Sequence, residues 1–191
     1  MARAIRAFLD ASVLYPVTLP NLLMRLTLGG LYQARWSAHV HEEWIRSVAR
    51  DHPHIPLARL HDVRVAMDEN AEDSLVIGYE ALIETLTLPD LNDRHVLAAA
   101  IVSGADVIVI HNLRDFPRAA LDPLAIEARH PDDFITHLLK LAPEVVIDAV
   151  RSQQASLTKP HVPMTDLLAL FERLGLNKTV AELHWLMPVP R

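Results

Sequence analysis

Hydrophobic residues along the chain form short runs separated by polar turns, and the shortest runs predict buried strands. Such runs occupy residues 4–9, 34–37, 82–88, 107–110 and 125–128. The run at 107–110 consists of β-branched residues alone, which is typical of a strand that is covered on both faces of a sheet.

Longer stretches with apolar residues three or four positions apart predict helices between these strands. Residues 12–30 are expected to form a helical hairpin, with Pro16 and Pro20 at early-turn or kink positions and Gly29-Gly30 at its end. Further helices are expected at residues 38–50, 57–72 and 91–103. Gly104 is a stop signal for the last of them. Strands that alternate with helices indicate an α/β domain with a parallel sheet.

The chain changes character at His130-Pro131, after which the pattern is helical throughout. Helices are expected at residues 133–140, 144–155, 164–174 and 179–186. We therefore divide the chain into an α/β domain over residues 1–130 and a helical C-terminal extension over residues 131–191. Leucine spacing in LLALFERLGL suits packing on the α/β domain or on a second chain, as in a homodimer, and Trp185 is expected to anchor that packing.

Composition narrows the class of protein. The 191 residues are 51% hydrophobic, enough for a substantial core, and they include no cysteine. The lack of cysteine excludes a disulfide framework, thiolate zinc sites and cysteine nucleophiles. No run of about 18 uncharged apolar residues suggests a membrane span, and Asp10 interrupts the one stretch that resembles a signal peptide. We expect a soluble cytoplasmic protein without a membrane partner.

The net charge of −6 argues against a protein that binds nucleic acid passively through the phosphate backbone. It permits an enzyme whose carboxylates hold cations that then meet phosphate. It would also suit a basic partner.

Two acids follow predicted strands. Asp10 ends the first strand, where Ser12 could hold its carboxylate by a hydrogen bond, and Asp115 lies in the loop after residues 107–110, together with Asn112. Sites in open parallel sheets form beyond the carboxyl ends of the strands, which gives both acids a place at one edge. The alternatives are ordinary: Asp10 as a helix cap and Asp115 as a turn residue.

Two further acids lie on predicted helices. Asp93 shares a helical face with Val96 and Leu97, so it lies at the edge of the core; a simple first-turn acid is the alternative, with Asp90 or Asn92 as the cap.

In HVHEEW, Glu43 lies roughly 60° around the helix from Val40 and Glu42 roughly 160°. Glu43 is therefore expected to reach inward and Glu42 to be solvated, unless both are surface charges. Carboxylates gathered at one edge need a counter-charge, and oxygen ligands suit Mg²⁺ or Mn²⁺, which can generate hydroxide from water.

Three segments, FLDASVLYP, SAHVHEEW and PDLNDRHVLAAAIVSGADVIVIHNLRDFP, resemble the PIN-domain nucleases over residues 3–130. The third segment is the most specific and is similar to the branch of VapC-type toxins. The tail, which begins ARHPDDF, resembles the C-terminal extension of some members of that branch. The resemblance implies a three-layer α/β fold with a central parallel sheet of four to five strands flanked by helices, in which residues 1–130 form the nuclease domain.

The resemblance also implies a metal-dependent endoribonuclease, often the toxin of a type II toxin–antitoxin pair. Its RNA substrate would include tRNA as a candidate, and its partner would be an antitoxin. The four family acids fall on Asp10, Glu43, Asp93 and Asp115. Asp10, Asp93 and Asp115 would ligate Mg²⁺ or Mn²⁺, and Glu43 would ligate or orient the attacking water. His111 departs from the family, which often has threonine here.

Other residues near these acids receive auxiliary roles. Ser12, Asp90 and Asn112 would support the acids. Arg94 and Arg114 flank the site in sequence and would contact RNA phosphate, against the alternative of solvated surface arginines.

Rival functions fit the sequence less well. His39, His41, His52 and His54 could bind zinc, but HVHEEW lacks the histidine spacing of H-E-x-x-H. Haloacid-dehalogenase-type phosphatases have an aspartate where Ser12 stands. Walker-A, dinucleotide-binding and G-x-S-x-G motifs are absent from the sequence.

A catalytically inactive PIN-like scaffold that binds RNA or protein is the alternative function, and retention of all four acids argues against it. The leucines of residues 22–31 could line a groove for a partner helix, but plain core packing is the favoured interpretation of them.

Overall fold

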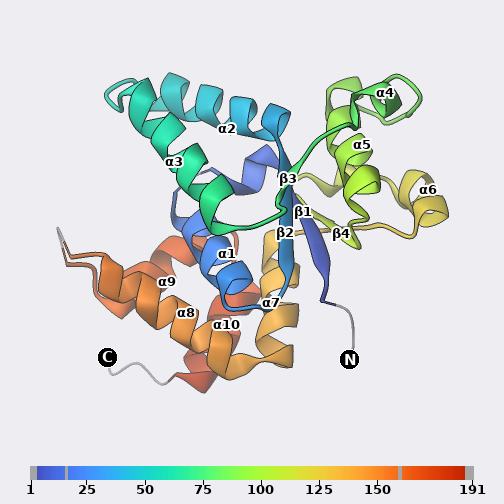
Figure 1. The fold of residues 1–191 in the computed structure, drawn as a ribbon. Helices are drawn as coiled ribbons and strands as arrows, with labels where there is room; N and C mark the ends of the chain where they lie inside the picture. Colours follow the sequence, from blue (N-terminus) through green and yellow to red (C-terminus); the bar gives the residue numbers. More distant parts are fainter. Residues whose placement is uncertain (1–3, 16, 159–160, 188–191) are drawn as a thin grey trace.

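The computed structural model describes residues 4–15, 17–158 and 161–187. Within these ranges the chain forms one sheet of five parallel strands in the order β3-β2-β1-β4-β5 (Figure 1). The strands are β1 (Arg6–Leu9), β2 (Gln33–Ser37), β3 (Leu75–Val76), β4 (Val107–Val109) and β5 (Glu127–Arg129). Phe8 in the central strand pairs with Arg35 on one side and Ile108 on the other. The predicted α/β fold with a central parallel sheet is confirmed.

Helices cover both faces of this sheet (Figure 1). On one side lie α1 (Thr18–Leu28), α2 (Ala38–Asp51) and α3 (Leu57–Asn70). On the other side lie α4 (Glu80–Ile83), α5 (Arg94–Ser103) and α6 (Arg118–Leu121). Short 3-10 turns precede or follow several of these elements: η1 (Ala11–Val13), η2 (Leu91–Asp93), η3 (Leu113–Asp115) and η4 (Asp122–Leu124). Gly104 ends α5 in the left-handed conformation, as its stop signal predicts.

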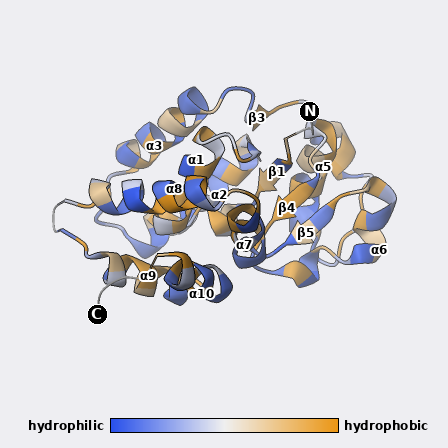
Figure 2. Cartoon of the chain, turned by 90° about the horizontal axis from the view of Figure 1, so that it is seen from below, coloured by the Kyte–Doolittle hydropathy of each residue, from blue (hydrophilic) through white to orange (hydrophobic). Residues whose placement is uncertain are grey.

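The C-terminal extension consists of α7 (Pro131–Leu141), α8 (Pro143–Ser156), α9 (Met164–Arg173) and α10 (Asn177–Leu186). Helix α8 packs along α1, and α10 packs against α7. Arg25 of α1 donates to the hydroxyl of Ser152 at 2.6 Å, and the Gln153 amide donates to the Thr18 carbonyl at 2.9 Å. In Figure 2 the helices carry hydrophilic and hydrophobic residues side by side, as expected for helices with one buried face.

A single hydrophobic core runs from the sheet into the extension. Phe134 of α7 is completely buried and meets the ring of Tyr32 edge-on, with the ring centroids 5.0 Å apart. Leu22, Leu23 and Leu26 are also completely buried, so their favoured interpretation as core residues is confirmed. The division of the chain into two parts at residue 130 stays a prediction.

No helix in the described ranges is long and apolar enough to cross a membrane.

Two predicted elements are wrong. Residues 12–30 form the short turn η1 and the single helix α1 instead of a helical hairpin. Pro20 lies in the first turn of α1, where its missing N–H costs no hydrogen bond, and Pro16 lies outside the described residues. Residues 82–88 form the end of α4 and a turn, in which the Thr85 amide bonds the Leu82 carbonyl at 2.9 Å. The edge strand β3 occurs earlier and has two residues, too few to create a periodic pattern.

Trp185 does not anchor the extension on the α/β domain, because 80% of its surface is exposed; packing against a second chain stays a prediction. The buried face of α10 consists of Thr179, Val180 and Leu183. Position 185 lies about 200° around the helix from Leu183, so its side chain turns to solvent.

Candidate active site

Asp10 leaves the carboxyl end of β1 and is 7% exposed. Its Oδ2 accepts the Ser12 backbone N–H at 2.8 Å, so it caps η1 while its carboxyl group remains at the sheet edge. Burial raises the pKa of Asp10, the hydrogen bonds from Ser12 oppose this, and the charge of Glu43 adds to the rise. The cap and the functional interpretation are therefore compatible, and an acid is held in a setting that disfavours its charge.

Asp93 lies at the junction of η2 and α5 and is half-buried. Burial, as the larger cause, and repulsion from the carboxylates of Asp10, Asp115 and Asp90 together raise the pKa of the Asp93 carboxyl to about 7. Asp90 supplies the cap at this helix start, accepting the Asn92 N–H at 2.8 Å. Asp93 is thus the acid whose pKa is raised by the charges of three others, Asp10, Asp115 and Asp90.

Glu43 turns toward the interior from α2, whereas Glu42 is exposed, as the helical spacing predicts. The Oε1 atom of Glu43 lies 3.0 Å from Nε2 of His95, a buried residue of α5. The sequence reasoning missed His95. Its signal was a histidine within the apolar run that follows Asp93, and the Nδ1 atom of the same ring is buried with no hydrogen-bond partner in the described part of the chain.

Asp115 ends η3, in the loop that follows β4, and is partly buried. The Asn112 amide donates to its Oδ2 at 2.6 Å, which matches the expected supporting position of Asn112. Arg114 is exposed. Arg94 donates to the Leu91 carbonyl and lies 3.3 Å from a Glu84 carboxylate oxygen. Of these two arginines, Arg94 would therefore have to give up a partner to bind a ligand, whereas Arg114 is exposed to solvent.

The chemistry of this cluster fits a divalent cation. The charge of Glu43 contributes to the raised pKa of Asp10, and those of Asp10, Asp115 and Asp90 contribute to the raised pKa of Asp93; a bound cation would remove that repulsion. Oxygen donors are those that Mg²⁺ and Mn²⁺ prefer. Among the described residues, however, no three His, Asp or Glu side chains are already arranged around one ion.

Three of the four histidines considered as rival zinc ligands have polar partners in the structure. His41 is completely buried, with Nε2 3.0 Å from Asp68 Oδ1 and Nδ1 accepting the Trp44 indole N–H at 2.9 Å. His52 Nε2 lies 3.2 Å from the Tyr15 hydroxyl. His39 Nδ1 lies 2.8 Å from the Tyr79 hydroxyl. These contacts give the rings a role in packing.

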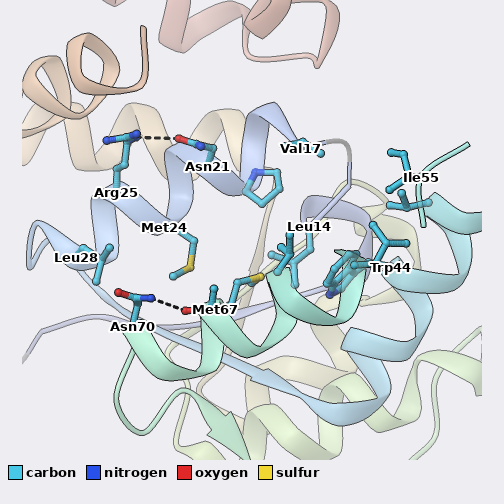
Figure 3. A pocket seen from close by; sticks show the side chains of 15 residues that line it. Leu14, Val17, Asn21, Met24, Arg25, Leu28, Trp44, Ile55, Met67 and Asn70 are labelled. Carbon is cyan, nitrogen blue, oxygen red and sulfur yellow. Dashed lines mark hydrogen bonds between the residues drawn. The ribbon is translucent and has the colours of Figure 1, made fainter. Parts of the chain in front are cut away.

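A separate apolar groove of about 490 Å³ lies between α1 and α3, away from the acids (Figure 3). Trp44 lies at one end of it, and Met24 and Met67 face each other across it. Asn21, Arg25 and Asn70 supply polar groups along its length. The groove uses residues of α1 other than the buried leucines.

Comparisons with known proteins give two matches. Residues 131–185 match the family described as VapC50 C-terminal domain. A protein of Mycobacterium tuberculosis strain H37Rv, described as "Putative ribonuclease VapC50", is 39% identical over 102 residues. That alignment covers 53% of this chain and 60% of the relative, so the chain spans less than two thirds of the protein that it resembles. No solved structure matches.

Proposed function

We propose that the chain is a VapC-like PIN-domain nuclease with a C-terminal helical extension and that it is a metal-dependent endoribonuclease. We propose further that it is the toxin of a type II toxin–antitoxin pair. The relative described as a ribonuclease supports hydrolysis of RNA. The observation that carries the proposal is Asp93, whose pKa of about 7 reflects burial and the charges of three neighbouring acids.

Each acid has a proposed role. Asp10, Asp93 and Asp115 would hold Mg²⁺ or Mn²⁺, which supplies a water of lowered pKa and neutralises the charge that develops on phosphate. Glu43, held by His95, would orient the attacking water. Ser12, Asn112 and Asp90 keep the neighbouring carboxylates and helix starts in place. Arg114, and Arg94 after release from Glu84, would contact RNA phosphate.

The antitoxin partner is assigned to the groove between α1 and α3. An amphipathic helix presents apolar residues along one stripe, and the groove offers an apolar floor of matching character. Homodimerisation and tRNA as substrate remain further parts of this proposal.

The first experiment compares the wild type with Asp93→Asn on total tRNA and other structured RNA, with Mg²⁺, Mn²⁺ or excess EDTA. Asparagine keeps the size of the side chain and removes its charge. We expect metal-dependent cleavage by the wild type alone. Wild-type protein that neither cleaves RNA nor binds Mn²⁺ in calorimetry would instead support the inactive scaffold.

A matched pair on α2 tests the site more sharply. Glu43→Gln and Glu42→Gln remove the same charge one residue apart, but only Glu43 faces the interior. We expect a loss of about 10²–10⁴-fold in cleavage for Glu43→Gln, as for other groups that manage a proton in the transition state, and wild-type activity for Glu42→Gln. Equal activity of the two variants would remove Glu43 from the mechanism.

A further inference from the structure

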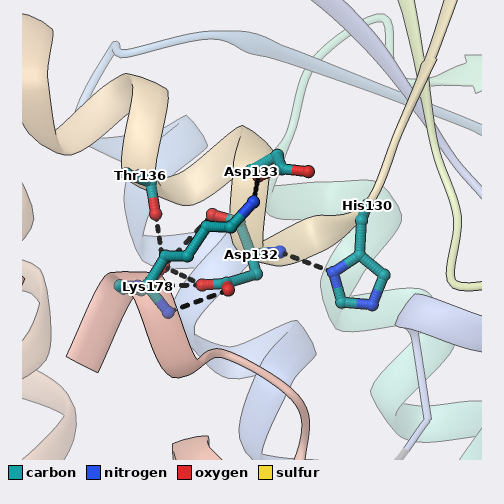
Figure 4. Close-up of polar contacts among 6 residues, drawn as sticks. His130, Asp132, Asp133, Thr136 and Lys178 are labelled. Carbon is teal, nitrogen blue, oxygen red and sulfur yellow. Dashed lines mark hydrogen bonds and ion pairs between the residues drawn. The ribbon is translucent and has the colours of Figure 1, made fainter. Parts of the chain in front are cut away.

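Two histidines of the α/β domain lie where the C-terminal extension meets the edge of the sheet. His130 immediately precedes α7, and its Nδ1 accepts the backbone N–H of Asp132 at 3.2 Å (Figure 4). On the other side of the same ring, Nε2 lies 3.2 Å from Nδ1 of His111. His111 follows β4 and begins the loop that leads to Asp115.

The hydrogen bonds define which nitrogen of each ring carries the proton. Because His130 Nδ1 accepts an N–H, neutral His130 carries its proton on Nε2 and donates it to His111. His111 Nδ1 is then an acceptor, and its proton lies on Nε2. Burial and the neighbouring His130 lower the pKa of His111, in agreement with a neutral His111 ring.

Hydrogen bonds from the start of α10 hold the start of α7, the helix that follows His130. The carboxylate of Asp132 is buried and accepts the backbone N–H of Lys178 at 2.9 Å and that of Thr179 at 2.8 Å. The Thr179 hydroxyl adds a third bond at 2.8 Å. The start of α10 is therefore bound to the start of α7 (Figure 4), directly beside His130.

The same series of contacts continues into the carboxylate cluster. The backbone N–H of His111 donates to the Ser12 hydroxyl at 3.4 Å, and the Ser12 N–H donates to Asp10 at 2.8 Å. Hydrogen bonds thus connect α10, Asp132, His130, His111, Ser12 and Asp10 without a break. The segments that they join are far apart in the sequence.

We infer that His111 and His130 are positioning residues through which the extension orients Asp10 and the loop that carries Asp115. The inference rests on the proposed function for its effect on metal and RNA, and on the hydrogen bonds alone for its effect on structure. The histidine pair holds the loop against α7 and so restrains the backbone amides of Ser12 and His111 in addition to the strand hydrogen bonds that Asp10 and Ile110 make. Loss of the pair leaves the sheet intact, since β4 and β5 pair independently of it.

Side-chain geometry provides matched variants. His130→Asn keeps an acceptor for the Asp132 N–H and removes the donor to His111, so α7 retains its cap. His111→Phe keeps a ring and removes the acceptor. His111→Asn places an oxygen where Nδ1 lies and therefore preserves the bond. Exposed His184 of α10, changed to Asn, is the control for loss of a histidine.

The first measurement is amide hydrogen exchange at Ser12 and His111 in the full chain, which requires neither metal nor RNA. We expect faster exchange in His130→Asn and His111→Phe, and wild-type exchange in His111→Asn and in His184→Asn. The double variant His130→Asn with His111→Phe should exchange no faster than either single variant, because both changes break one bond. Unchanged exchange in the single variants would overturn the inference, whatever the protein does to RNA.

The second measurement uses Mn²⁺ in calorimetry and total tRNA as the cleavage probe. We expect about tenfold weaker Mn²⁺ binding and a lower kcat at unchanged KM in His130→Asn and His111→Phe, as for other residues that orient metal ligands indirectly. A wild type without either activity would contradict the proposed function and leave the exchange result standing. An active wild type with equally active His111→Phe would contradict the positioning role.

Discussion

The imidazole of His95 lies 3.0 Å from the carboxylate of Glu43, and the two residues come from helices on opposite sides of the carboxyl edge of the sheet. The Nδ1 atom of His95 has no partner among the described residues, which leaves Nε2 as the nitrogen that carries the proton of the neutral ring and donates it to Glu43. This hydrogen bond restrains the Glu43 carboxylate and links α2 to α5. His95 is therefore positioned to orient Glu43 and not to contact the substrate itself.

Removal of this hydrogen bond should lower the cleavage of RNA. We expect His95→Phe to lose about 10- to 100-fold in kcat, in line with about 1.5–3 kcal/mol for a hydrogen bond to a charged group. His95→Gln should recover most of the activity, because its amide nitrogen occupies the place of Nε2. In a Glu43→Gln background, His95→Phe should have no further effect, and an additional loss there would assign His95 a role of its own.

Asp93 makes the metal-free protein less stable as the pH rises. Its pKa in the folded protein is about 7 against 3.8 for the ordinary group, so between these values the folded state binds more protons than the unfolded state. Stability therefore falls as the pH rises through this window. Burial raises the pKa of Asp10 and acts in the same direction.

Thermal unfolding of Asp93→Asn checks this expectation. The variant should melt above the metal-free wild type at pH 8 and match it near pH 4. Addition of Mn²⁺ at pH 8 should raise the melting temperature of the wild type and leave that of the variant nearly unchanged, since the ion binds the folded state only. A variant that melts below the wild type at pH 8 would contradict the electrostatic account of the site.

The extension and the α/β domain should unfold together, because Phe134 places its ring in the core against Tyr32. We expect Phe134→Ala to lower the free energy of unfolding by about 3–5 kcal/mol, measured by urea titration, and Trp185→Ala to change it by less than about 0.5 kcal/mol.

Deletion of all residues after Asp133 should yield poorly soluble protein, since it uncovers the apolar face of α1 that α8 covers. A soluble and fully active truncation would show that the extension is dispensable.

The groove between α1 and α3 should be needed for antitoxin binding and not for catalysis. Met24→Glu introduces a charge into the groove, and Val102→Glu introduces one at an exposed apolar residue of α5 on the other side of the sheet. With a small DNA-binding protein encoded by a neighbouring gene as the partner, Met24→Glu should weaken the complex by at least about tenfold and Val102→Glu should not. Both variants should cleave RNA as the wild type does, and equal binding by both would exclude the groove.

The local pattern of apolar and polar residues predicted structure correctly where burial of one strand or one helical face set the pattern of neighbouring residues. The β-branched run of residues 107–110 predicted the buried strand β4, and helical spacing separated Glu43 from Glu42. The expectation that Trp185 anchors the extension on the α/β domain failed, because the sequence does not tell which face of α10 meets another helix. The pattern failed for residues 82–88 because a few alternating residues fit a turn as well as a strand.

The sequence by itself therefore determined the α/β class and most of the helices, since each depends on residues adjacent along the chain or on one helix. The four acids were predicted through the family resemblance, and their role in catalysis stays a prediction. Only the tertiary structure decided the two-residue edge strand β3, the partnership of His95 with Glu43 and that of His111 with His130. These partners are 52 and 19 residues apart, and they meet only after the helices pack on the sheet. Periodicity records that a side chain is buried, whereas the packing of distant segments selects the atom that it contacts.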